Sequence, residues 1–432
     1  MNIKIIPKSL EGILKVPPSK SGSHRAIIAA GLSEGKSKID NLIFSQDIIA
    51  TLDGMKAIGT DYEIIEPSIK FGTGSVNIEG RGKVEIREHT IDANESGSTL
   101  RFLIPLAAID RSKVTFTGRG KLVERPLDTY YDIFKEQGID YNTTDGKLPL
   151  TIYGGLKPGE FQMPGNISSQ FISGLLFSLP LLSGDSIVNV TSPLESKGYV
   201  DLTIEVLELF GIKVENKDYN KFKIKGNQKY KNRDYSVEGD YSQAAFFIVG
   251  GILGKSVSCT GLKTESLQGD RAILDIVKEM GADIDISDDM IRANPSSTHG
   301  IEIDASQCPD LVPILATLGA LSQGTTRIVN AKRLRIKESD RLKAMATELN
   351  KLGADIIELE DGLEINGKER LKGGIVDSWN DHRIAMALAI ASIKCKGELI
   401  IQNSQAVEKS YPGFWSDFEK LGGEILERNM GK

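Results

Sequence analysis

The sequence predicts an α/β protein of two domains that is built from six copies of one repeat. Six amphipathic stretches each end at a glycine, and a short run of polar and apolar residues follows each of them. These glycines are Gly59, Gly138, Gly211, Gly281, Gly353 and Gly422, at spacings of about 79, 73, 70, 72 and 69 residues. Spacings this even indicate a repeated structural module. The length of 432 residues also exceeds what one compact core normally holds, which favours two domains.

The end of each repeat is predicted to be a helix, a glycine turn and a strand. Glycine adopts the left-handed conformation that ends a helix without a steric penalty. In the fifth repeat, Leu342, Met345, Leu349 and Leu352 fall on one face of such a helix. We expect the Glu and Lys residues between them to point to solvent.

Each repeat also contains an earlier helix that is apolar on almost every side, so it is expected to be buried. These helices are predicted at residues 26–32, 100–108, 171–182, 244–253, 311–321 and 384–393. A strand is predicted after each of them, at residues 37–39, 113–116, 186–190, 256–259, 326–329 and 398–401. Three repeats fit in each half, and the polar stretch 226–234 is the expected junction. A strand at residues 2–6 is left over, so the chain is expected to cross between the domains twice.

Composition narrows the class of protein. With 40% hydrophobic and 26% charged residues, the chain is typical of soluble globular proteins. The net charge of -6 argues against a nucleic-acid-binding surface over the whole molecule. Cys259, Cys308 and Cys395 are far apart and lack metal-ligand spacing, which favours a reducing compartment without disulfides. No signal peptide and no apolar run long enough to cross a bilayer are found, so we expect a cytoplasmic protein.

Polar residues gather just before the six buried helices, at residues 18–25, 94–101, 166–170, 239–243, 306–310 and 380–383. Helix N-termini attract anions, because they carry free N–H groups and a partial positive charge. Each Ser, Asn or Asp taken alone is equally consistent with an ordinary N-cap. Lys20, Arg25, Arg101 and Arg383 favour anion binding, since a cation gains nothing at a helix N-terminus unless an anion lies between them.

A second group of polar residues lies in the loops before the amphipathic helices, at residues 119–126, 195–199, 332–341 and 408–412. Charged loops are usually solvated. Segment 332–341, however, concentrates basic residues around Glu338 in an acidic protein, which indicates anion binding beside a proton-transfer group. The sequence contains no phosphate-binding P-loop, no convincing dinucleotide-binding glycine motif and no nucleophile elbow. The four histidines are too dispersed for a recognisable metal site, so we expect neither metal nor cofactor.

Seven segments resemble the 5-enolpyruvylshikimate-3-phosphate synthases of the enolpyruvyl transferase family, in the family's order and over almost the whole chain. They are residues 18–21 with 24–25, 97–101, 124–126, 168–171, 337–341, 380–383 and 409–412. The resemblance implies a two-domain inside-out α/β barrel with three β-α-β-α-β-β units per domain. It implies an N-terminal-type domain of residues 19–234. A C-terminal-type domain of residues 1–18 and 235–432 would be completed by the N-terminal strand, with the active site in the cleft between the domains.

The resemblance also implies a reaction and a set of site residues. The enolpyruvyl group of phosphoenolpyruvate would pass to the 5-hydroxyl of shikimate 3-phosphate, with release of phosphate, in aromatic amino acid biosynthesis. Shikimate 3-phosphate would be held by Lys20, Ser21, Arg25, Ser168, Ser169, Gln170, Ser196, Tyr199, Asp310 and Lys337. Phosphoenolpyruvate would be held by Lys20, Gly97, Arg125, Gln170, Arg341, Arg383 and Lys409.

The family resemblance also implies roles in catalysis or positioning for four residues. Asp310 would accept the proton of the attacking hydroxyl, and Glu338 would move the proton at C3 of the enolpyruvyl group, sharing this work with Lys20. His382 is expected to position rather than catalyse. The only partners expected are the two small-molecule substrates, with no nucleic acid and no membrane, and the protein is expected to be a monomer.

Two departures from the family pattern and two alternatives stay open. Glu95 stands where many members have Asn, and Arg333 stands where some have an Asn that contacts shikimate. Both change the charge near the site, with consequences for substrate affinity and for inhibitors such as glyphosate.

One alternative is the transferase that acts on UDP-N-acetylglucosamine, which usually has Cys where this chain has Gly120. The other is a non-catalytic anion-binding protein of this fold. The fourth repeat, with residues 239–243 and Arg271, is expected to serve chiefly as scaffold.

Overall fold

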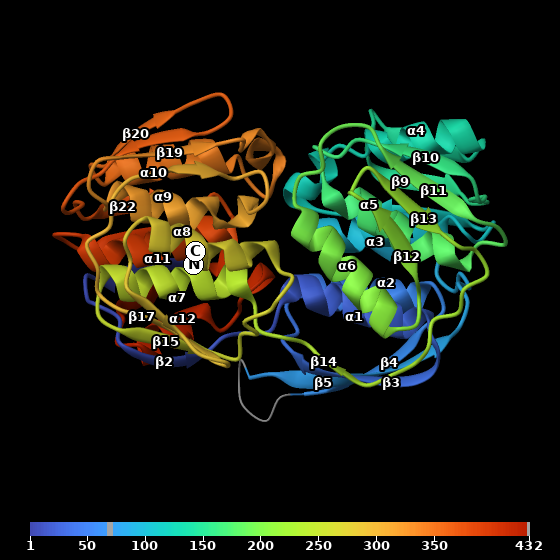
Figure 1. Ribbon diagram of the computed structural model, residues 1–432, viewed down its shortest axis with the longest axis horizontal. Coiled ribbons are helices and arrows are strands. Elements are labelled where there is room, and N and C mark those ends of the chain that lie inside the picture. Colours follow the sequence, from blue (N-terminus) through green and yellow to red (C-terminus); the bar gives the residue numbers. More distant parts are fainter. Residues whose placement is uncertain (67–71, 430–432) are drawn as a thin grey trace. The chain divides into compact units, whose positions relative to one another are not determined.

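The computed structural model describes residues 1–66 and 72–429 and divides the chain into two compact units. The central unit is Pro18–Val237, and the terminal unit is Met1–Pro17 together with Glu238–Lys432. Among the described residues, three four-stranded sheets belong to each unit. The chain therefore passes into the central unit after Pro17 and leaves it after Val237 (Figure 1).

The helices and strands of the central unit follow one another in the order of three repeats. They are α1 (Lys20–Leu32), β3 (Glu34–Leu42), α2 (Gln46–Ala57), β4 (Asp61–Ile65), β5 (Gly74–Arg81), β6 (Thr90–Asp92), α3 (Gly97–Ala107), β7 (Lys113–Thr117), α4 (Asp128–Gln137), β8 (Asp140–Thr144), β9 (Lys147–Tyr153), β10 (Glu160–Met163), α5 (Ser169–Ser178), β11 (Ser186–Val190), α6 (Lys197–Leu209), β12 (Val214–Lys217), β13 (Lys221–Ile224) and β14 (Tyr235–Ser236). Two 3-10 helices, η1 (Gly120–Glu124) and η2 (Leu179–Leu181), lie between them.

The terminal unit has the same succession, with two strands contributed by the start of the chain. Its elements are β1 (Asn2–Ile6), β2 (Gly12–Lys15), α7 (Tyr241–Leu253), β15 (Val257–Thr260), α8 (Ile273–Glu279), β16 (Ile284–Ile286), β17 (Met290–Ala293), β18 (Glu302–Asp304), α9 (Val312–Ala320), β19 (Thr325–Val329), α10 (Arg341–Lys351), β20 (Asp355–Glu358), β21 (Leu363–Asn366), β22 (Gly374–Asp377), α11 (His382–Ala391), β23 (Leu399–Gln402), α12 (Phe414–Lys420) and β24 (Glu424–Asn429). Its 3-10 helices are η3 (Gly269–Ala272), η4 (Pro309–Leu311), η5 (Lys332–Ile336), η6 (Ser392–Lys394) and η7 (Ser404–Lys409).

One strand order recurs in every sheet. In the sheet β6-β7-β9-β8, β6 is parallel to β7, and β9 is antiparallel to both of its neighbours. The other central sheets are β14-β3-β5-β4 and β10-β11-β13-β12, and the terminal sheets are β16-β17-β15-β2, β18-β19-β21-β20 and β22-β23-β1-β24. The repeat predicted from the glycine spacing is therefore confirmed as a β-sheet module with two helices.

Three of the sheets are completed by strands near the two points where the chain passes between the units. Strands β1 and β2 precede the first point, and β14 precedes the second. The strand predicted at residues 2–6 is β1, which lies between β23 and β24 and pairs Ile3 with Ile401. Strand β2 is parallel to β15, and β14 is parallel to β3. Neither β2 nor β14 was expected, because neither follows a buried helix or an amphipathic helix with its glycine, the signals by which the strands of each repeat were predicted.

The six apolar helices form the interior of the units, as predicted. In the terminal unit, every residue of α7 and α11 is buried, and Figure 1 shows α7, α9 and α11 between the sheets. In the central unit, α1, α3 and α5 occupy the same place. Each unit has its own hydrophobic cluster. Sheets outside and apolar helices inside give the inside-out arrangement.

The glycine turns after the amphipathic helices are also confirmed. The six glycines have φ angles between +67° and +112°, which L side chains adopt only with strain. At Gly138, the N–H donates to Lys135 O (3.3 Å), and strand β8 begins two residues later. Among residues 1–66 and 72–429, none of the helices has the length and apolar character needed to cross a membrane.

Five of the six buried helices begin earlier than predicted, inside the polar segments, and α9 is the exception. The side chains of Ser19, Ser96, Ser168, Asp240 and Asp381 accept hydrogen bonds from N–H groups two or three residues further on, as N-caps do. Lys20 and Arg25 therefore lie within α1 rather than before it. Capping explains why these polar residues occur there, but it leaves the cations without a structural reason.

The amphipathic helix of the fifth repeat requires one correction. Leu342, Met345 and Leu349 are buried in α10 as predicted, but Glu348 is only 1% exposed instead of facing solvent. Its carboxylate accepts hydrogen bonds from Trp379 Nε1 (2.8 Å), Lys351 Nζ and Asp377 N. A buried carboxylate is tolerated where several donors replace water, and a periodic pattern along one helix does not reveal such donors.

Candidate active site

The predicted site residues fall into two sets, one in each unit. The central set is Lys20, Ser21, Arg25, Gly97, Arg125, Ser168, Ser169, Gln170, Ser196 and Tyr199. The terminal set is Asp310, Lys337, Glu338, Arg341, Arg383 and Lys409.

Arg341 is the centre of the terminal set. It is the first residue of α10, it is 1% exposed, and its guanidinium donates to three carboxylates. Nη1 bonds Asp310 Oδ1 (2.8 Å), Nη2 bonds Glu338 Oε2 (2.8 Å), and Nε bonds Asp381 Oδ2 (2.9 Å). Burial acts to lower the pKa of Arg341, but the three carboxylates outweigh it and raise this pKa.

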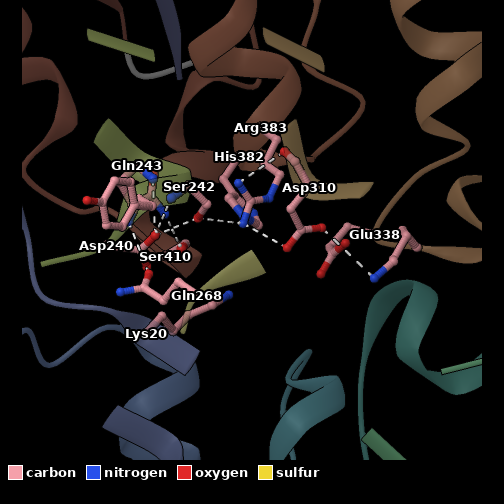
Figure 2. Close-up of polar contacts among 12 residues, drawn as sticks. Lys20, Asp240, Ser242, Gln243, Gln268, Asp310, Glu338, His382, Arg383 and Ser410 are labelled. Carbon is pink, nitrogen blue, oxygen red and sulfur yellow. Dashed lines mark hydrogen bonds and ion pairs between the residues drawn. The ribbon is translucent and has the colours of Figure 1, made fainter. Parts of the chain in front are cut away.

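Asp310 is held between two arginines. It lies in η4, directly before α9, and its Oδ2 accepts from Arg383 Nη2 (2.9 Å), as Figure 2 shows. Lys337 Nζ lies 4.0 Å from Asp310 Oδ1. Burial acts to raise the pKa of Asp310, but Arg383, Lys337 and Arg341 lower it well below its ordinary value. Asp310 is therefore an ionised carboxylate at neutral pH, the form that can accept a proton.

Glu338 and Lys337 are more accessible than their partners. The side chain of Glu338 is 20% exposed and that of Lys337 is 30% exposed, compared with 1% for Arg341. Burial lowers the pKa of Lys337 to about 8, although Asp310 acts in the opposite direction. Both side chains are therefore accessible enough to meet a ligand, and the burial of Lys337 brings its proton within reach of release near neutral pH.

Asp381 joins the starts of two helices and was not recognised from the sequence as a site residue. It caps α11 by accepting from Arg383 N (2.9 Å), and it accepts from Ser339 Oγ (3.0 Å) just before α10. His382 is 2% exposed, and its Nδ1 lies 3.8 Å from Asp381 Oδ1. Its position at the base of the carboxylate cluster agrees with a positioning role. The N-cap position of Asp381 was the signal that could have identified it.

The basic segment 332–341 divides into structural and candidate binding residues. Lys332 bonds Glu360 (2.8 Å), and Arg335 bonds Glu358 (2.6 Å) and Asp340 (2.9 Å). These two cations therefore stabilise the neighbouring β20-β21 hairpin, which corrects the expectation that the whole segment binds anions.

The remaining predicted cations of the terminal unit are held by backbone oxygens. Arg333, 9% exposed, donates through Nη2 to Ser306 O (2.6 Å). Lys409 in η7 donates through Nζ to Asn380 O (2.8 Å), just before α11. Lys409 is thereby directed to the same helix start as Arg383.

In the central unit, Arg25 joins α1 to α6. It is 2% exposed, and its Nη1 and Nη2 donate to the backbone oxygens of Ser21 (2.8 Å) and Tyr199 (2.9 Å). Its Nε donates to Thr203 Oγ1 (2.7 Å). Burial lowers the pKa of Arg25 to about 10, so it stays charged at neutral pH.

Gly97 lies directly beneath two guanidinium groups. A Cβ atom at this position would be 2.8 Å from Arg125 Nη1 and 3.0 Å from Arg101 Nη1. Arg101 Nη1 also donates to Gln170 Oε1 (2.8 Å), and Gln170 Nε2 donates to Ser98 Oγ (2.9 Å). Arg101 of α3, Arg125 after η1 and Gln170 of α5 thus bring two cations and an amide to the N-terminus of α3, which is a suitable site for an anion.

Lys20 belongs to a buried network that the sequence did not reveal. Its Nζ donates to Asp47 Oδ2 (3.0 Å) on α2. Close by, His24 Nδ1 lies 2.7 Å from Thr51 Oγ1, which in turn lies 2.6 Å from Thr99 Oγ1. Burial, followed by the charges of Lys20 and Arg25, lowers the pKa of His24 well below its ordinary value. The imidazole is therefore neutral at physiological pH.

The other predicted residues of this unit lie at helix starts. Ser168 caps α5 by accepting from Gln170 N (3.3 Å), and Ser169 begins that helix. Ser196, with φ +56°, precedes α6, and Tyr199 lies in the first turn of α6. These positions agree with the predicted gathering of polar groups at helix N-termini.

Glu95 occupies the space that a side chain at position 120 would need. A Cβ atom built on Gly120 would lie 2.8 Å from Glu95 Oε2. In addition, Gly120 has φ +54°, which disfavours other residues. In the part of the chain that the structure describes, no group of three or more His, Cys, Asp or Glu side chains is arranged to hold a metal ion.

Comparison with known proteins gives consistent matches over the full length of the chain. The family model for EPSP synthase (3-phosphoshikimate 1-carboxyvinyltransferase) matches residues 5–418. The 3-phosphoshikimate 1-carboxyvinyltransferase of Clostridium novyi is 63% identical, with 100% of both chains covered. That of Clostridium kluyveri is 57% identical, with 100% of this chain and 99% of the relative covered. The solved EPSP synthase from Acinetobacter baumannii is 28% identical, with a TM-score of 0.81 over 99% of this chain and 100% of that one.

Proposed function

The chain belongs to the EPSP synthase family of 3-phosphoshikimate 1-carboxyvinyltransferases, and we propose that the central and terminal sets of residues form its active site. The reaction transfers the enolpyruvyl group of phosphoenolpyruvate to the 5-hydroxyl of shikimate 3-phosphate and releases phosphate, within the shikimate pathway. Both substrates are anions, which accounts for cations concentrated locally in a chain whose net charge is -6.

The observation that carries this proposal is the contact of Asp310 with both Arg341 and Arg383, beside Glu338. Asp310 accepts the proton of the 5-hydroxyl as its oxygen attacks C2 of phosphoenolpyruvate. Glu338, with Lys20, delivers a proton to C3. The tetrahedral intermediate then loses phosphate, and the C3 proton is removed to restore the double bond.

Each substrate is held by residues from both sets. Shikimate 3-phosphate binds Lys20, Ser21, Arg25, Ser168, Ser169, Gln170, Ser196, Tyr199, Asp310 and Lys337. Phosphoenolpyruvate binds Lys20, Gly97, Arg125, Gln170, Arg341, Arg383 and Lys409. Arginine suits this task, because its planar guanidinium forms paired hydrogen bonds with carboxylate and phosphate.

Charge balance in the terminal set gives substrate binding a further effect. Around Arg341, the cations Arg341, Arg383 and Lys337 contact three carboxylates, which are Asp310 and Glu338 of the terminal set and the neighbouring Asp381. When an anionic substrate binds, its negative groups therefore replace these carboxylates as partners of the guanidinium groups. Asp310 and Glu338 lose cation contacts in this exchange, so the pKa of Asp310, which those cations hold down, rises toward the range useful for proton transfer.

The remaining proposals concern the cellular compartment, the partners and the oligomeric state of the enzyme. We propose a cytoplasmic monomer whose partners are its two small-molecule substrates. The three cysteines are free and buried, which is consistent with a reducing compartment. Sedimentation at micromolar concentration tests the oligomeric state.

The experiment that tests the function is a phosphate-release assay with two acceptors. Phosphoenolpyruvate is supplied with either shikimate 3-phosphate or UDP-N-acetylglucosamine. We expect release with the first acceptor alone, because the chain belongs to the 3-phosphoshikimate 1-carboxyvinyltransferases and has Gly120 where the alternative transferase usually has Cys. Release with UDP-N-acetylglucosamine alone would support the alternative transferase, and release with neither would support a non-catalytic anion-binding protein.

Removing either proton-transfer group should abolish turnover without abolishing binding. We expect Asp310→Ala and Glu338→Ala to lower kcat by roughly 10²-fold to 10⁴-fold, the usual contribution of general acid–base catalysis. Calorimetric titration should still detect shikimate 3-phosphate binding. Glu360→Ala is the control, since it removes an exposed carboxylate paired with Lys332. Unchanged turnover in either variant would contradict the role assigned to that residue.

A further inference from the structure

The fourth repeat, which was expected to serve chiefly as scaffold, contacts a residue of the terminal set through Ser242. Its buried helix α7 begins with a polar turn that is capped by Asp240. Asp240 Oδ1 accepts from Ser242 N (2.8 Å), from Gln243 N (3.1 Å) and from Ser242 Oγ (2.6 Å). Asp240, Ser242 and Gln243 are all at most 4% exposed. Arg271, by contrast, donates to Thr264 O and supports a loop.

Ser242 holds the same nitrogen of Arg383 that contacts Asp310. The proton of its hydroxyl is committed to Asp240, so its oxygen accepts from Arg383 Nη2 (3.0 Å), as Figure 2 shows. The same nitrogen donates its other hydrogen to Asp310 Oδ2 (2.9 Å). An anionic substrate can replace Asp310, but it does not compete for a hydrogen directed at a neutral hydroxyl. Ser242 therefore keeps the guanidinium in place during that exchange.

Gln243 makes a similar supporting contact with the segment that carries Lys409. Its Nε2 donates to Ser410 Oγ (2.9 Å), and both side chains are buried. Ser410 directly follows Lys409, whose Nζ bonds Asn380 O (2.8 Å). One helical turn thus fixes two segments that carry predicted phosphoenolpyruvate ligands. These contacts join residues that are 141 and 167 positions apart in the chain.

We propose that the first turn of α7 is a positioning element for phosphoenolpyruvate binding, in which Ser242 orients Arg383 and Gln243 orients the Lys409 segment. This inference rests on the proposed function, which assigns both cations to phosphoenolpyruvate. Ser242 and Gln243 act through those cations and do not touch the reacting atoms.

The test compares the two substrates in variants of this turn. Ser242→Ala is expected to raise KM for phosphoenolpyruvate about tenfold, the usual effect of losing one hydrogen bond to a charged group. Gln243→Leu is expected to raise it severalfold. KM for shikimate 3-phosphate should change less than twofold in both variants. General damage to the fold would alter both KM values, so this contrast separates positioning from a structural role.

Tyr241→Phe is the matched control. It removes a hydrogen bond from the same turn, between Tyr241 Oη and Lys263 O (2.8 Å), without touching Arg383 or Ser410. We expect both KM values to stay within twofold of the unmodified enzyme. A thermal melt of each variant establishes that folding is retained.

A double-mutant cycle with Arg383→Lys tests whether Ser242 acts through Arg383. Once the guanidinium is gone, adding Ser242→Ala should change KM for phosphoenolpyruvate less than twofold. Effects that multiply independently would overturn the proposal, as would KM values that stay within twofold in both single variants. If Arg383→Lys alone leaves KM for phosphoenolpyruvate unchanged, the assignment of Arg383 in the proposed function is wrong, and the positioning role falls with it.

Discussion

Single residues in this site owe their properties to immediate neighbours. Asp310 and Lys337 are close together, yet their pKa values are governed by different causes. Three cations overcome burial at Asp310 and keep it ionised, whereas burial dominates at Lys337 and brings its pKa to about 8. A carboxylate that stays ionised therefore lies beside an ammonium that is close to losing its proton.

Lys337 leads to a prediction of pH dependence. Its ammonium loses charge as the pH rises through about 8, and a neutral amine attracts a phosphate group far less. We expect KM for shikimate 3-phosphate to rise between pH 7 and about pH 9. In Lys337→Arg, whose guanidinium stays protonated, this rise should disappear. A steady-state pH profile with the same inflection in both proteins would exclude Lys337 as its source.

Gly97 leads to a prediction of steric specificity. A methyl group there would approach Arg125 Nη1 and Arg101 Nη1 more closely than atoms normally do. We expect Gly97→Ala to displace these guanidinium groups and to raise KM for phosphoenolpyruvate at least about tenfold, with little change in thermal stability. Gly138→Ala is a useful comparison, because nothing lies within 4 Å of its Cβ position and only its turn is strained. An unchanged KM in Gly97→Ala would show that the two arginines do not hold this substrate.

At the scale of elements, many of the candidate site residues lie at or near the N-termini of helices. Capping residues such as Ser19, Ser96 and Asp381 satisfy the first N–H groups of α1, α3 and α11. Each cap then sets the direction in which the following cation projects. Arg383, two residues after Asp381, and Arg341, at the start of α10, are tied together through that one carboxylate.

The packing of α1, α2 and α3 gives a prediction about acid stability. His24 on α1 is buried beside Thr51 on α2, and its pKa is held well below the ordinary value of 6.5. Below pH 6.5 the unfolded chain binds a proton at His24 that the folded chain does not, so stability falls as the pH falls.

Urea unfolding at pH 7.5 and pH 5.5 measures this contribution. We expect His24→Gln to be less stable than the unmodified protein at pH 7.5 and to lose less stability on acidification. His89, which is exposed, serves as the control in His89→Gln. An equal pH effect in the unmodified protein and in His24→Gln would contradict the prediction.

At the scale of the whole molecule, the order of the chain does not follow the order of the units. The first strand, β1, lies between β23 and β24, so the terminal unit is completed by both ends of the sequence. The predicted ligands of each substrate come from both units. The proposed function therefore predicts that full binding of either substrate requires residues of both units.

Small-angle scattering tests whether the two units close when both ligands are bound. We expect the radius of gyration to decrease when shikimate 3-phosphate is added together with a non-reacting phosphoenolpyruvate mimic. UDP-N-acetylglucosamine at the same concentration is the control and should cause no change. Scattering curves that stay identical after saturating addition of both ligands would contradict a closing motion of the two units.

Much of the fold could be predicted because its signals are local. The glycines after the amphipathic helices and the apolar character of the buried helices follow from backbone sterics and hydrophobicity, and both were confirmed. The weaker predictions concerned charges. Glu348 was expected in solvent and is buried, and Lys332 was expected to bind anions but pairs with Glu360. The domain limits and the roles of the site residues stay predictions that the experiments above test.

The sequence by itself determined the repeat, the α/β class and the family, because spacing, periodicity and motif order are properties of the chain alone. Only the tertiary structure decided which charged groups meet. Ser242 reaches Arg383, and Asp381 reaches Arg341, across 141 and 40 positions of the chain. Contacts of this kind depend on how repeats stack, and no pattern within one repeat encodes its neighbour's side chains. The copy with the fewest recognisable polar motifs, the fourth, thereby contributes to the candidate site.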